Sequence, residues 1–585
     1  MGNIISSSIP IPPGVEDTGE PLPSESSGLD FGPNVLILDP NMSSNEVQSK
    51  VDTVFRTQES NQFGQQRYAI FFKPGAYQAN VQVGFYTTVH GLGTTPDAVT
   101  ITGGVNVTAR WFQGNATQNF WRGVENLAVL PTVWSNSAMF ATSQATWLRR
   151  VHMKGFLQLF DFTSAPPEVN WSSGGFIADT IIDNDVISGS QQQYLTRNTK
   201  FNSWPGGVWN MVFVGDINPP SGSSWPKPPF TVVTDTPVVR EKPYLIIDGS
   251  NNYSVVVPAL KRNSRGPSWD GGVNHDASNT IPLSEFYVAH SDRDDARSLN
   301  IALGRNKHLL LTPGVYNLAQ PIVVRNPNTV VFGLGLATLM PTQGNPALMV
   351  ADVDGVTIAG LLFDAGSSNS PNLLQIGNIG SSTVDHSANP TALFDISCRV
   401  GGAAPGARTN SCVVINSRHV IMDNVWLWRA DHGVHPTGWS INPCLQGLIV
   451  NSDNVTAYGL FCEHFEGFQT LWNGNDGSVY FYQSEAPYDV PSQIQWTQNG
   501  ENGYPSYKVS KNVTSHRAYG VGVYCFFTNP VQLNNAIETP TGPDISMNRL
   551  VTVFLDGNPA SSINHIINGT GPTANRDTRI QYSTN

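Results

Sequence analysis

The sequence predicts an all-β protein made of two tandem right-handed parallel β-helices, pectin-lyase-like solenoids that pack side by side. Three observations predict this fold: a turn-rich composition, a unit that occurs twice, and short strands that recur at coil-like intervals. The core of a solenoid grows with each coil, so a chain of 585 residues does not need a series of separate globular domains.

The composition favours strands and turns over helices. Charged residues make up only 13% of the chain, while Gly (54) and Pro (41) are plentiful, which is unlike a helical bundle. The net charge of −12 argues against nucleic acid, anionic membranes and polyanionic substrates. No apolar run is long enough to span a membrane. The 14 Trp suit sugar stacking or, equally, a large β core.

One unit of sequence occurs twice. Residues 70–93 and 309–335 each contain an apolar strand, then Pro-Gly-x-Tyr, then a second strand that ends in Gly-Leu-Gly. Two copies of one architecture are the simplest explanation of this repeat.

A short helix is predicted ahead of each copy. Ser43 or Ser44 is a candidate cap for the first helix, and Asp294 or Asp295 for the second. The apolar faces expected of the two helices consist of Val47, Val51, Val54 and Phe55 in the first, and Ala296, Leu299 and Leu303 in the second.

The repeat divides the chain into four parts. We expect an extended N-terminal arm over residues 1–40 and a first β-helix over 41–261. A polar linker, rich in Gly and Asn, follows at 262–286, and a second β-helix occupies 287–585.

Short strands recur along the second half, most clearly at 350–366, 414–433, 449–465 and 478–489. Most of these segments combine an apolar pair, a polar turn and an alternating strand. A parallel β-helix stacks like residues on like and uses Asn or Asp at its corners. A β-sandwich would instead show tight hairpin signals such as Asn-Gly between paired strands.

Glycosylation sequons favour secretion, and we expect an extracellular protein. Eight N-x-S/T sequons occur, at Asn41, Asn106, Asn115, Asn170, Asn252, Asn454, Asn512 and Asn568. The cysteines are Cys398, Cys412, Cys444, Cys462 and Cys525. Because their number is odd, at least one lacks an intrachain partner, and the pairing of the others stays open.

Glu463 and Glu485 are the strongest candidates for catalysis. They lie 22 residues apart, about one coil, and each occurs near the end of an alternating strand. In register they would stand on adjacent rungs, about 4.7–4.9 Å apart. Two carboxyls that close cannot both ionise freely, so one is kept protonated, as a general acid for glycosidic cleavage requires. The alternative is a solvated pair on an outer face, which the surrounding aromatic residues make less attractive.

Three segments around these glutamates resemble glycoside hydrolase family 55, fungal and bacterial β-1,3-glucanases, most closely a divergent branch. The segments are VWLWRADHG (425–433), GLFCEHFEGFQTLW (459–472) and YQSEAPYDVP (482–491). The resemblance implies two tandem parallel β-helices, exo action on β-1,3-glucan, and inversion at the anomeric carbon.

The resemblance also implies a role for each catalytic residue. Glu485 matches the general acid, and Glu463 matches a second carboxylate that supports it. Gln144 and Ser173 match the residues that hold the nucleophilic water, with Ser172 as a competitor for Ser173. The plain alternative for Gln144 and Ser173 is a role in turns.

Adjacent rungs raise a question about stereochemistry. Retaining glycosidases separate their two carboxyls by roughly 5–5.5 Å, and inverting ones by roughly 6.5–9.5 Å. The resemblance resolves this by making the pair an acid and its helper instead of an acid and a base.

Further residues are expected to contact the substrate; they are Trp472, Tyr488, His464 and Gln483. Trp472 and Tyr488 are candidate stacking platforms. Trp426 and Trp428 fit either stacking or a core. Two departures from the family pattern, Phe465 in place of a second His and Asp489 in place of a second Tyr, leave room for a different linkage preference.

The sequence therefore predicts an exo-acting glycoside hydrolase of β-1,3-glucan that uses a general acid and a positioned water. The alternatives are a hydrolase of α-1,3- or β-1,6-glucan, a polysaccharide lyase, and a non-catalytic carbohydrate-binding solenoid. We expect a monomer that needs no cofactor and no metal. Asp352, Asp354 and Asp364 lack the rest of a calcium loop and are interpreted as turn carboxylates.

Overall fold

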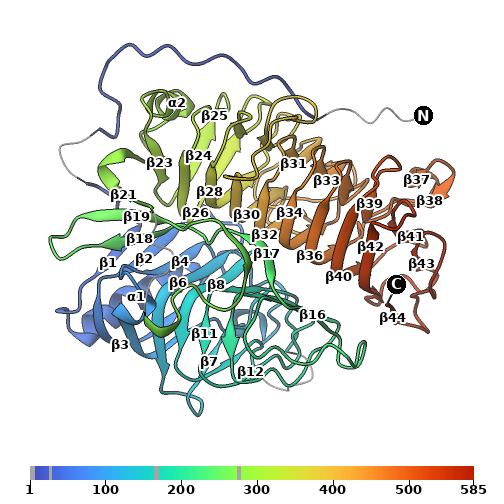
Figure 1. The fold of residues 1–585 in the computed structure, drawn as a ribbon, viewed down its shortest axis with the longest axis horizontal. Coiled ribbons are helices and arrows are strands. Elements are labelled where there is room, and N and C mark those ends of the chain that lie inside the picture. The colour runs from blue at the N-terminus through green and yellow to red at the C-terminus, as the bar shows by residue number, and fades with distance from the viewer. Residues whose placement is uncertain (1–6, 26–28, 164–169, 273–278, 585) are drawn as a thin grey trace.

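The computed structural model describes residues 7–25, 29–163, 170–272 and 279–584. Two stacks of mostly parallel strands lie side by side, the first in blue and cyan and the second in yellow to red (Figure 1). The predicted fold class of two packed parallel β-helices is confirmed.

The first solenoid presents one long sheet, called sheet 1, toward the second solenoid. Its parallel strands follow one another in chain order. They are β1 (Val35–Leu38), β2 (Tyr68–Phe72), β4 (Thr87–Gly91), β6 (Arg122–Pro131), β8 (Thr146–Met153), β10 (Phe176–Ala178), β13 (Gln193–Arg197), β15 (Asn210–Val214) and β16 (Phe230–Val233).

The second solenoid has two long sheets, and the chain alternates between them. Sheet 2 faces the first solenoid and consists of β22 (Phe286–Ala289), β23 (His308–Leu311), β26 (Val330–Pro341), β28 (Thr357–Asp364), β30 (Ala392–Val400), β32 (Ile421–Arg429), β34 (Thr456–Glu463), β36 (Gly477–Glu485), β40 (His516–Cys525), β42 (Ile545–Phe554) and the antiparallel β44 (Ile580–Ser583). Sheet 3 consists of β25 (Ile322–Val324), β27 (Leu348–Val350), β29 (Leu374–Ile376), β31 (Ser411–Ile415), β33 (Gln446–Val450), β35 (Thr470–Trp472), β39 (Tyr507–Val509), β41 (Gln532–Glu538) and β43 (Ser562–Ile567).

Both predicted helices are present near the start of their solenoids. Helix α1 (Ser44–Gln58) is capped by the Ser43 side chain, and α2 (Ala296–Gly304) by a capping box that Asp295 forms with Ser298. The valines predicted for α1 and the three apolar residues predicted for α2 are buried.

Antiparallel strands connect the two stacks. Strand β17 (Thr236–Val239) pairs with β20 (Lys261–Ser264), while β19 (Tyr253–Val257) pairs with both β18 (Tyr244–Ile247) and β21 (Asn279–Pro282). The parallel strands of sheet 1 end with β16 at Val233, and this antiparallel connecting segment begins at Thr236.

Each solenoid has its own apolar interior, and a third apolar cluster lies between them. The third cluster combines residues of the first solenoid such as Trp121 and Phe176 with sheet 2 residues such as Trp426 and Phe461. Both solenoids thus bury large aromatic side chains against one another, which fixes sheet 1 across from sheet 2.

The second Gly-Leu-Gly of the repeat makes a close contact between the solenoids. Gly335 has a positive φ of 59°, and its amide donates a 3.0 Å hydrogen bond to Thr88 Oγ1. A Cβ at this position would lie 2.6 Å from the carbonyl oxygen of Tyr68. Only glycine permits both the conformation and the approach.

A buried network of ion pairs also crosses this interface. Asp423 of β32 accepts hydrogen bonds from Arg149 of β8 and Arg197 of β13, each at 2.8 Å. Arg149 also pairs with Asp395 of β30 at 2.8 Å, and Arg197 with Glu241 at 2.7 Å. The charges are almost fully buried, so each must keep its partners.

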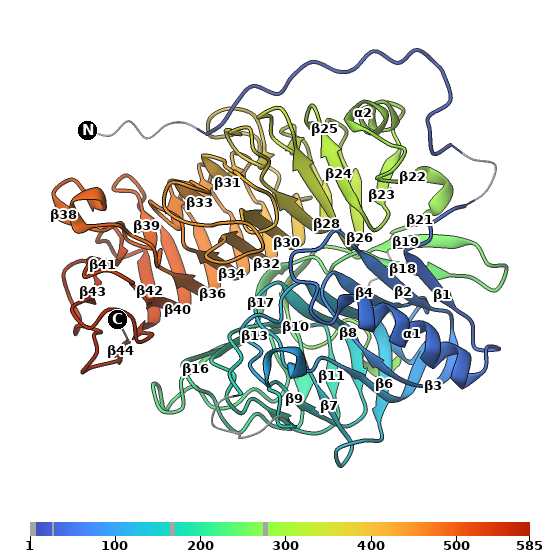
Figure 2. The ribbon, with the colours of Figure 1, turned by 180° about the vertical axis from the view of Figure 1, so that it is seen from behind.

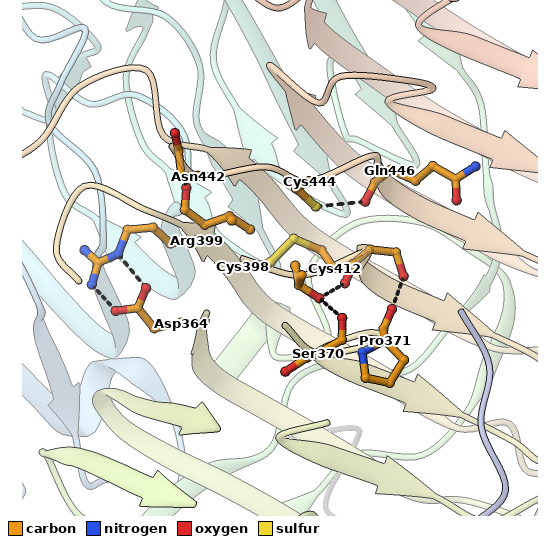
Figure 3. Close-up of a disulfide and its surroundings, with 12 residues drawn as sticks. Asp364, Ser370, Pro371, Cys398, Arg399, Cys412, Asn442, Cys444 and Gln446 are labelled. Atoms are coloured by element: carbon orange, nitrogen blue, oxygen red, sulfur yellow. Dashed lines mark hydrogen bonds and ion pairs between the residues drawn. A yellow bond between two sulfur atoms is a disulfide. The ribbon is translucent and has the colours of Figure 1, made fainter. Parts of the chain in front are cut away.

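The structure resolves the pairing that the sequence left open. Cys398 and Cys412 form a disulfide between β30 and β31, while Cys444, Cys462 and Cys525 are buried free thiols. Figure 3 shows the disulfide with Cys444 near it, the thiol directed to the carbonyl oxygen of Gln446. The same view shows Asp364 bound to Arg399, so this carboxylate takes part in an ion pair.

Residues 7–25 run along the outside of the second solenoid (Figures 1 and 2), while Val35–Leu38, which the sequence placed in the same arm, form β1 of sheet 1. Backbone groups of Ile9 bond the Gln375 side chain, and Asp17 accepts two 2.9 Å hydrogen bonds from Arg305. Within the described ranges, no helix combines the length and apolar character needed to cross a membrane.

Candidate active site

The two glutamates stand side by side at one edge of sheet 2. Glu463 is the last residue of β34 and Glu485 the last of β36, and the two are register partners. The prediction that a spacing of 22 residues places them on adjacent rungs is confirmed. Their surroundings differ, and that difference decides what each can do.

Glu463 is held between the two solenoids. Its side chain is only 3% exposed. Oε2 accepts a 3.0 Å hydrogen bond from Trp426 Nε1, and Oε1 accepts a 2.7 Å hydrogen bond from Gln144 Nε2. Gln144 comes from the first solenoid, two residues before β8, so the site needs both halves of the chain.

Glu485 is more accessible, with a side chain that is 15% exposed. The Tyr488 hydroxyl donates a hydrogen bond to Oε2, and Gln483 Nε2 lies 3.3 Å from Oε1. His464 Nε2 stands 4.0 Å from Oε2. The predicted contact residues Tyr488, His464 and Gln483 therefore surround Glu485.

Burial raises the pKa of both glutamates. For Glu463, burial and then the charge of Glu485 raise the pKa well above the usual range. For Glu485, burial raises the pKa, while His464 and the Tyr488 hydroxyl partly oppose this effect. A pair this close keeps one proton at pH values where an isolated glutamate has lost it.

The hydrogen-bond donors indicate which glutamate holds that proton. Both oxygens of Glu463 accept from N–H groups, and the indole of Trp426 can only donate. These bonds favour an ionised Glu463. Glu485 adjoins the Tyr488 hydroxyl, which can donate or accept, so the shared proton fits on Glu485.

Ser173 and Gln144 lie together across from the glutamates. Ser173 Oγ is 3.4 Å from Gln144 Oε1 and 3.0 Å from Ser143 Oγ. Ser172, the competitor in the sequence, is fully buried and its hydroxyl has no hydrogen-bond partner in the described part of the chain. Ser173 is therefore the serine that approaches Gln144.

Asp431 and His432 belong to the surroundings of the site. Asp431 Oδ1 lies 3.9 Å from His464 Nε2 and 3.0 Å from His432 Nδ1. Hydrogen bonding to His432 and the charge of His464 outweigh burial and lower the pKa of Asp431 to about 2. Gln62 of the first solenoid reaches His432 at 2.8 Å.

Aromatic rings fill the interface on one side of the glutamates. Trp428, the register partner of Glu463 on β32, stacks on Trp426 with centroids 5.1 Å apart. Both tryptophans pack on Trp121 of the first solenoid, at 5.3 and 5.9 Å. On the other side, Tyr524 of β40 pairs with Glu485 and meets the half-exposed Trp209 at 5.4 Å.

The prediction that Trp472 stacks on substrate is wrong. Trp472 lies on β35 of sheet 3, is 0% exposed, and belongs to the interior of the second solenoid. Its ring packs against His516 at 4.9 Å. Phe465 is also in that interior, so this departure from the family pattern replaces a polar ring by a core residue.

Comparisons with known protein families and relatives agree with this arrangement. The family model described as "LAM55 pectate lyase-like domain" matches residues 286–485. An "Exo-beta-1,3-glucanase" from Streptomyces sp. (strain SirexAA-E / ActE) is 48% identical over 557 residues, which cover 94% of this chain and 89% of that protein.

Two solved structures are also similar to this chain over nearly its whole length. The structure of sacteLam55A from Streptomyces sp. SirexAA-E has a TM-score of 0.90 and 45% identity, covering 95% of this chain and 99% of that one. A variant of sacteLam55A in complex with glucose has the same TM-score and identity, with 95% and 98% covered.

Proposed function

This chain belongs to glycoside hydrolase family 55, and from that premise we propose that it is an exo-β-1,3-glucanase that cleaves glucosyl units from the end of a β-1,3-glucan. The observation that carries the proposal is the register pair Glu463 and Glu485, with Gln144 of the opposite solenoid bonded to Glu463. The relatives of known structure and activity support the same assignment.

In this proposal Glu485 is the general acid. It is the more exposed glutamate, and its raised pKa and its hydroxyl neighbour Tyr488 suit a carboxyl that stays protonated until it meets the glycosidic oxygen. As the bond to the anomeric carbon breaks, the proton moves to the leaving sugar, and Glu485 becomes a carboxylate that His464 stabilises.

Gln144 and Ser173 hold the water that attacks the anomeric carbon. Gln144 donates a hydrogen bond from its amide N–H to Glu463. This bond polarises the amide and makes Gln144 Oε1 a better acceptor for a water hydrogen. Ser173 Oγ lies beside the same oxygen. Because both residues come from the solenoid opposite Glu485, the water approaches from the other side of the sugar, and the anomeric carbon inverts. The proton that the water loses goes to Gln144 Oε1 while the Gln144 Nε2–H proton passes to the ionised Glu463, which ends the step protonated.

The hydrogen bonds of Glu463 argue against a retaining mechanism. A retaining enzyme needs its second carboxylate as a free nucleophile. Here each oxygen of Glu463 is committed to an N–H donor, one from Trp426 and one from Gln144. Glu463 is therefore assigned to anchoring the water-binding amide and stabilising positive charge at the reacting carbon.

The aromatic packing supports exo action. The rings of Trp121, Trp426 and Trp428 occupy the interface on the β32 side of the glutamates. A glucan chain can then extend only toward the β40 side, where Tyr524 and Trp209 lie. This places a chain end, not a chain middle, at Glu485.

We also propose that the protein acts outside the cell as a monomer. One chain supplies both Gln144 and Glu463, so no second subunit is needed to complete the site. Four sequons lie on exposed asparagines, at Asn41, Asn252, Asn512 and Asn568, whereas Asn106 and Asn170 are fully buried. Size-exclusion chromatography and mass analysis of protein from a eukaryotic host test both points.

One experiment tests the function. The protein is incubated with β-1,3-, β-1,6-, α-1,3- and mixed-linkage glucans and with pectate, and the products are identified by mass and by the NMR signal of the first anomer formed. We expect α-glucose from β-1,3-glucan, and a roughly 10³-fold loss in Glu485→Gln but not in Glu501→Gln, an exposed glutamate on β38 (Glu501–Asn502).

The rival functions give different results. An unsaturated, ultraviolet-absorbing product identifies a lyase, and preference for another glucan identifies a different linkage. Binding without release of sugar, unchanged in Glu485→Gln, identifies a non-catalytic module. Any of these outcomes rejects the proposal.

A further inference from the structure

We infer that Arg429, held by Asp489, is a positioning residue that fixes the turns after both catalytic glutamates and so aims the acid at the glycosidic oxygen. This inference rests on the proposed function, in which Glu485 donates the proton. Neither residue touches the carboxyls of Glu463 or Glu485 in the structure; they act through the backbone and through Tyr488.

Arg429 is a fully buried hub at the edge of sheet 2. It is the last residue of β32 and is 1% exposed. Its Nε donates a 3.1 Å hydrogen bond to the carbonyl oxygen of Asn442, and its Nη1 donates one of 3.2 Å to the carbonyl oxygen of His464. His464 directly follows Glu463, so the guanidinium holds the turn that leaves the first glutamate.

Asp489 connects the same guanidinium to the turn that leaves the second glutamate. Its two oxygens accept from Arg429 Nη1 at 3.1 Å and Nη2 at 2.8 Å, a two-point ion pair. Asp489 directly follows Tyr488, whose hydroxyl bonds Glu485. The ion pair therefore restrains the tyrosine that contacts the acid.

These contacts form a closed ring around the acid. The His464 amide donates a 2.9 Å hydrogen bond to the Glu485 carbonyl oxygen, and the His464 carbonyl oxygen accepts from Arg429. Arg429 binds Asp489, and the neighbouring Tyr488 returns to the Glu485 side chain. Both the backbone and the carboxyl of Glu485 are thus fixed by one ring, which needs the planar, multi-donor guanidinium.

A second carboxylate competes for Arg429. Glu466 Oε1 lies 3.5 Å from Arg429 Nη2, farther than the oxygens of Asp489. Burial raises the pKa of Glu466 to about 7, and the charge of Asp489 contributes. Asp489 is therefore the carboxylate that provides the firm two-point contact.

The test compares two leaving groups. Cleavage of a β-1,3-linked oligosaccharide requires proton donation, whereas a 2,4-dinitrophenyl β-glucoside has a leaving group that departs without it. In Asp489→Asn we expect kcat on the oligosaccharide to fall about tenfold with KM within about twofold, and kcat on the dinitrophenyl glucoside to fall less than about threefold.

Three further variants sharpen the test. Asp489→Glu keeps a carboxylate and should regain most of the oligosaccharide rate, while Arg429→Lys, which cannot make the two-point contact, should resemble Asp489→Asn. Asp17→Asn breaks the matched two-point pair with Arg305 in the N-terminal arm and should leave both rates unchanged. Thermal unfolding is recorded for each variant; if Asp489→Asn does not fold, Arg429→Lys and Asp489→Glu provide the comparison.

The outcomes separate this inference from the proposed function. If the wild-type protein releases no sugar from β-1,3-glucan, the proposed function fails. If the wild-type protein is active but Asp489→Asn keeps its oligosaccharide rate, or loses both rates equally, the positioning role is overturned.

Discussion

Two glutamates one rung apart have different roles because their hydrogen-bond partners differ. Glu463 accepts N–H groups on both oxygens, while Glu485 adjoins a hydroxyl and reaches solvent. Burial alone would raise the pKa of either group. The donors therefore assign the proton to Glu485, and the N–H groups of Trp426 and Gln144 that bind Glu463 can be tested by substitution.

The indole N–H of Trp426 is one of these donors. Trp426→Phe keeps an aromatic ring but removes the 3.0 Å hydrogen bond to Glu463. Losing a hydrogen bond to a charged group costs about 1.5–3 kcal/mol, so we expect kcat on β-1,3-glucan to fall roughly 10- to 100-fold. Trp472→Phe is the matched control, since Trp472 is equally buried but its Nε1 has no hydrogen-bond partner among the described residues. Equal activities of the two variants would contradict the assignment.

Glu466 gives a pH dependence of stability. Burial raises its pKa from an ordinary 4.5 to about 7, with Arg429 partly opposing the shift. The folded protein therefore binds this proton more tightly than the unfolded chain, and stability falls as pH rises from about 4.5 to about 7. The loss is at most about 3 kcal/mol, since one pKa unit corresponds to about 1.4 kcal/mol.

Calorimetry checks this dependence. We expect the Tm of wild-type protein to fall more between about pH 5 and pH 8 than the Tm of Glu466→Gln, because the variant cannot ionise there. Glu501→Gln should follow the wild type. A parallel decline in Glu466→Gln would show that Glu466 is not the group responsible.

Among single residues, those in short local motifs could be identified from the sequence, whereas a residue whose role depends on a distant partner could not. Glu463, Glu485 and Tyr488 stand in short motifs, so they could be found. Arg429 could not, because its partner Asp489 lies 60 residues away. Trp472 was misplaced because a three-residue strand carries too little alternation to show whether it belongs to sheet 2 or sheet 3.

At the element scale, coil spacing was enough to predict register. Strands β34 and β36 align residue for residue up to the glutamates, as a spacing of one coil requires. The loop that carries Ser173 was harder to predict, since its shape depends on a glutamine from the next coil. Gln191 Oε1 accepts from the Gly174 amide at 2.7 Å, and its Nε2 reaches the carbonyl oxygens of Thr142, Leu159 and Gly174.

Gln191→Leu tests this support. The substitution leaves buried backbone groups unpaired, which costs about 1–3 kcal/mol each, and it releases the loop that positions Ser173. We expect a lower Tm together with a fall in kcat of about tenfold. Gln158→Leu on β9 (Phe156–Gln158), which loses a 3.1 Å contact to Ser137, should leave kcat unchanged. A Gln191→Leu protein with wild-type kcat would show that the loop holds its own shape.

At the scale of the whole molecule, the repeat predicted two solenoids but not how they bind one another. The contacts that fix their relative position join residues far apart in sequence: Arg149 with Asp423, Gln144 with Glu463, Thr88 with Gly335. No local pattern encodes such pairs. The same contacts hold Gln144 against Glu463, so the stability of the interface and the geometry of the site depend on one another.

Asp423 tests that dependence. It is the carboxylate shared by Arg149 and Arg197, and all three side chains are buried. Asp423→Asn leaves two guanidinium groups short of a charged partner in a dry interface, which costs about 3–5 kcal/mol.

Each solenoid has its own apolar interior, so the weakened interface should uncouple them. We expect calorimetry to show one unfolding transition in the wild type and two in Asp423→Asn, with kcat reduced in the folded variant because Gln144 moves away from Glu463. Exposed pairs are screened by salt and buried ones far less, so high salt should not produce the same change in the wild type. Two transitions already present in wild-type protein, or an Asp423→Asn variant that unfolds in one step with full activity, would mean that aromatic packing alone joins the solenoids.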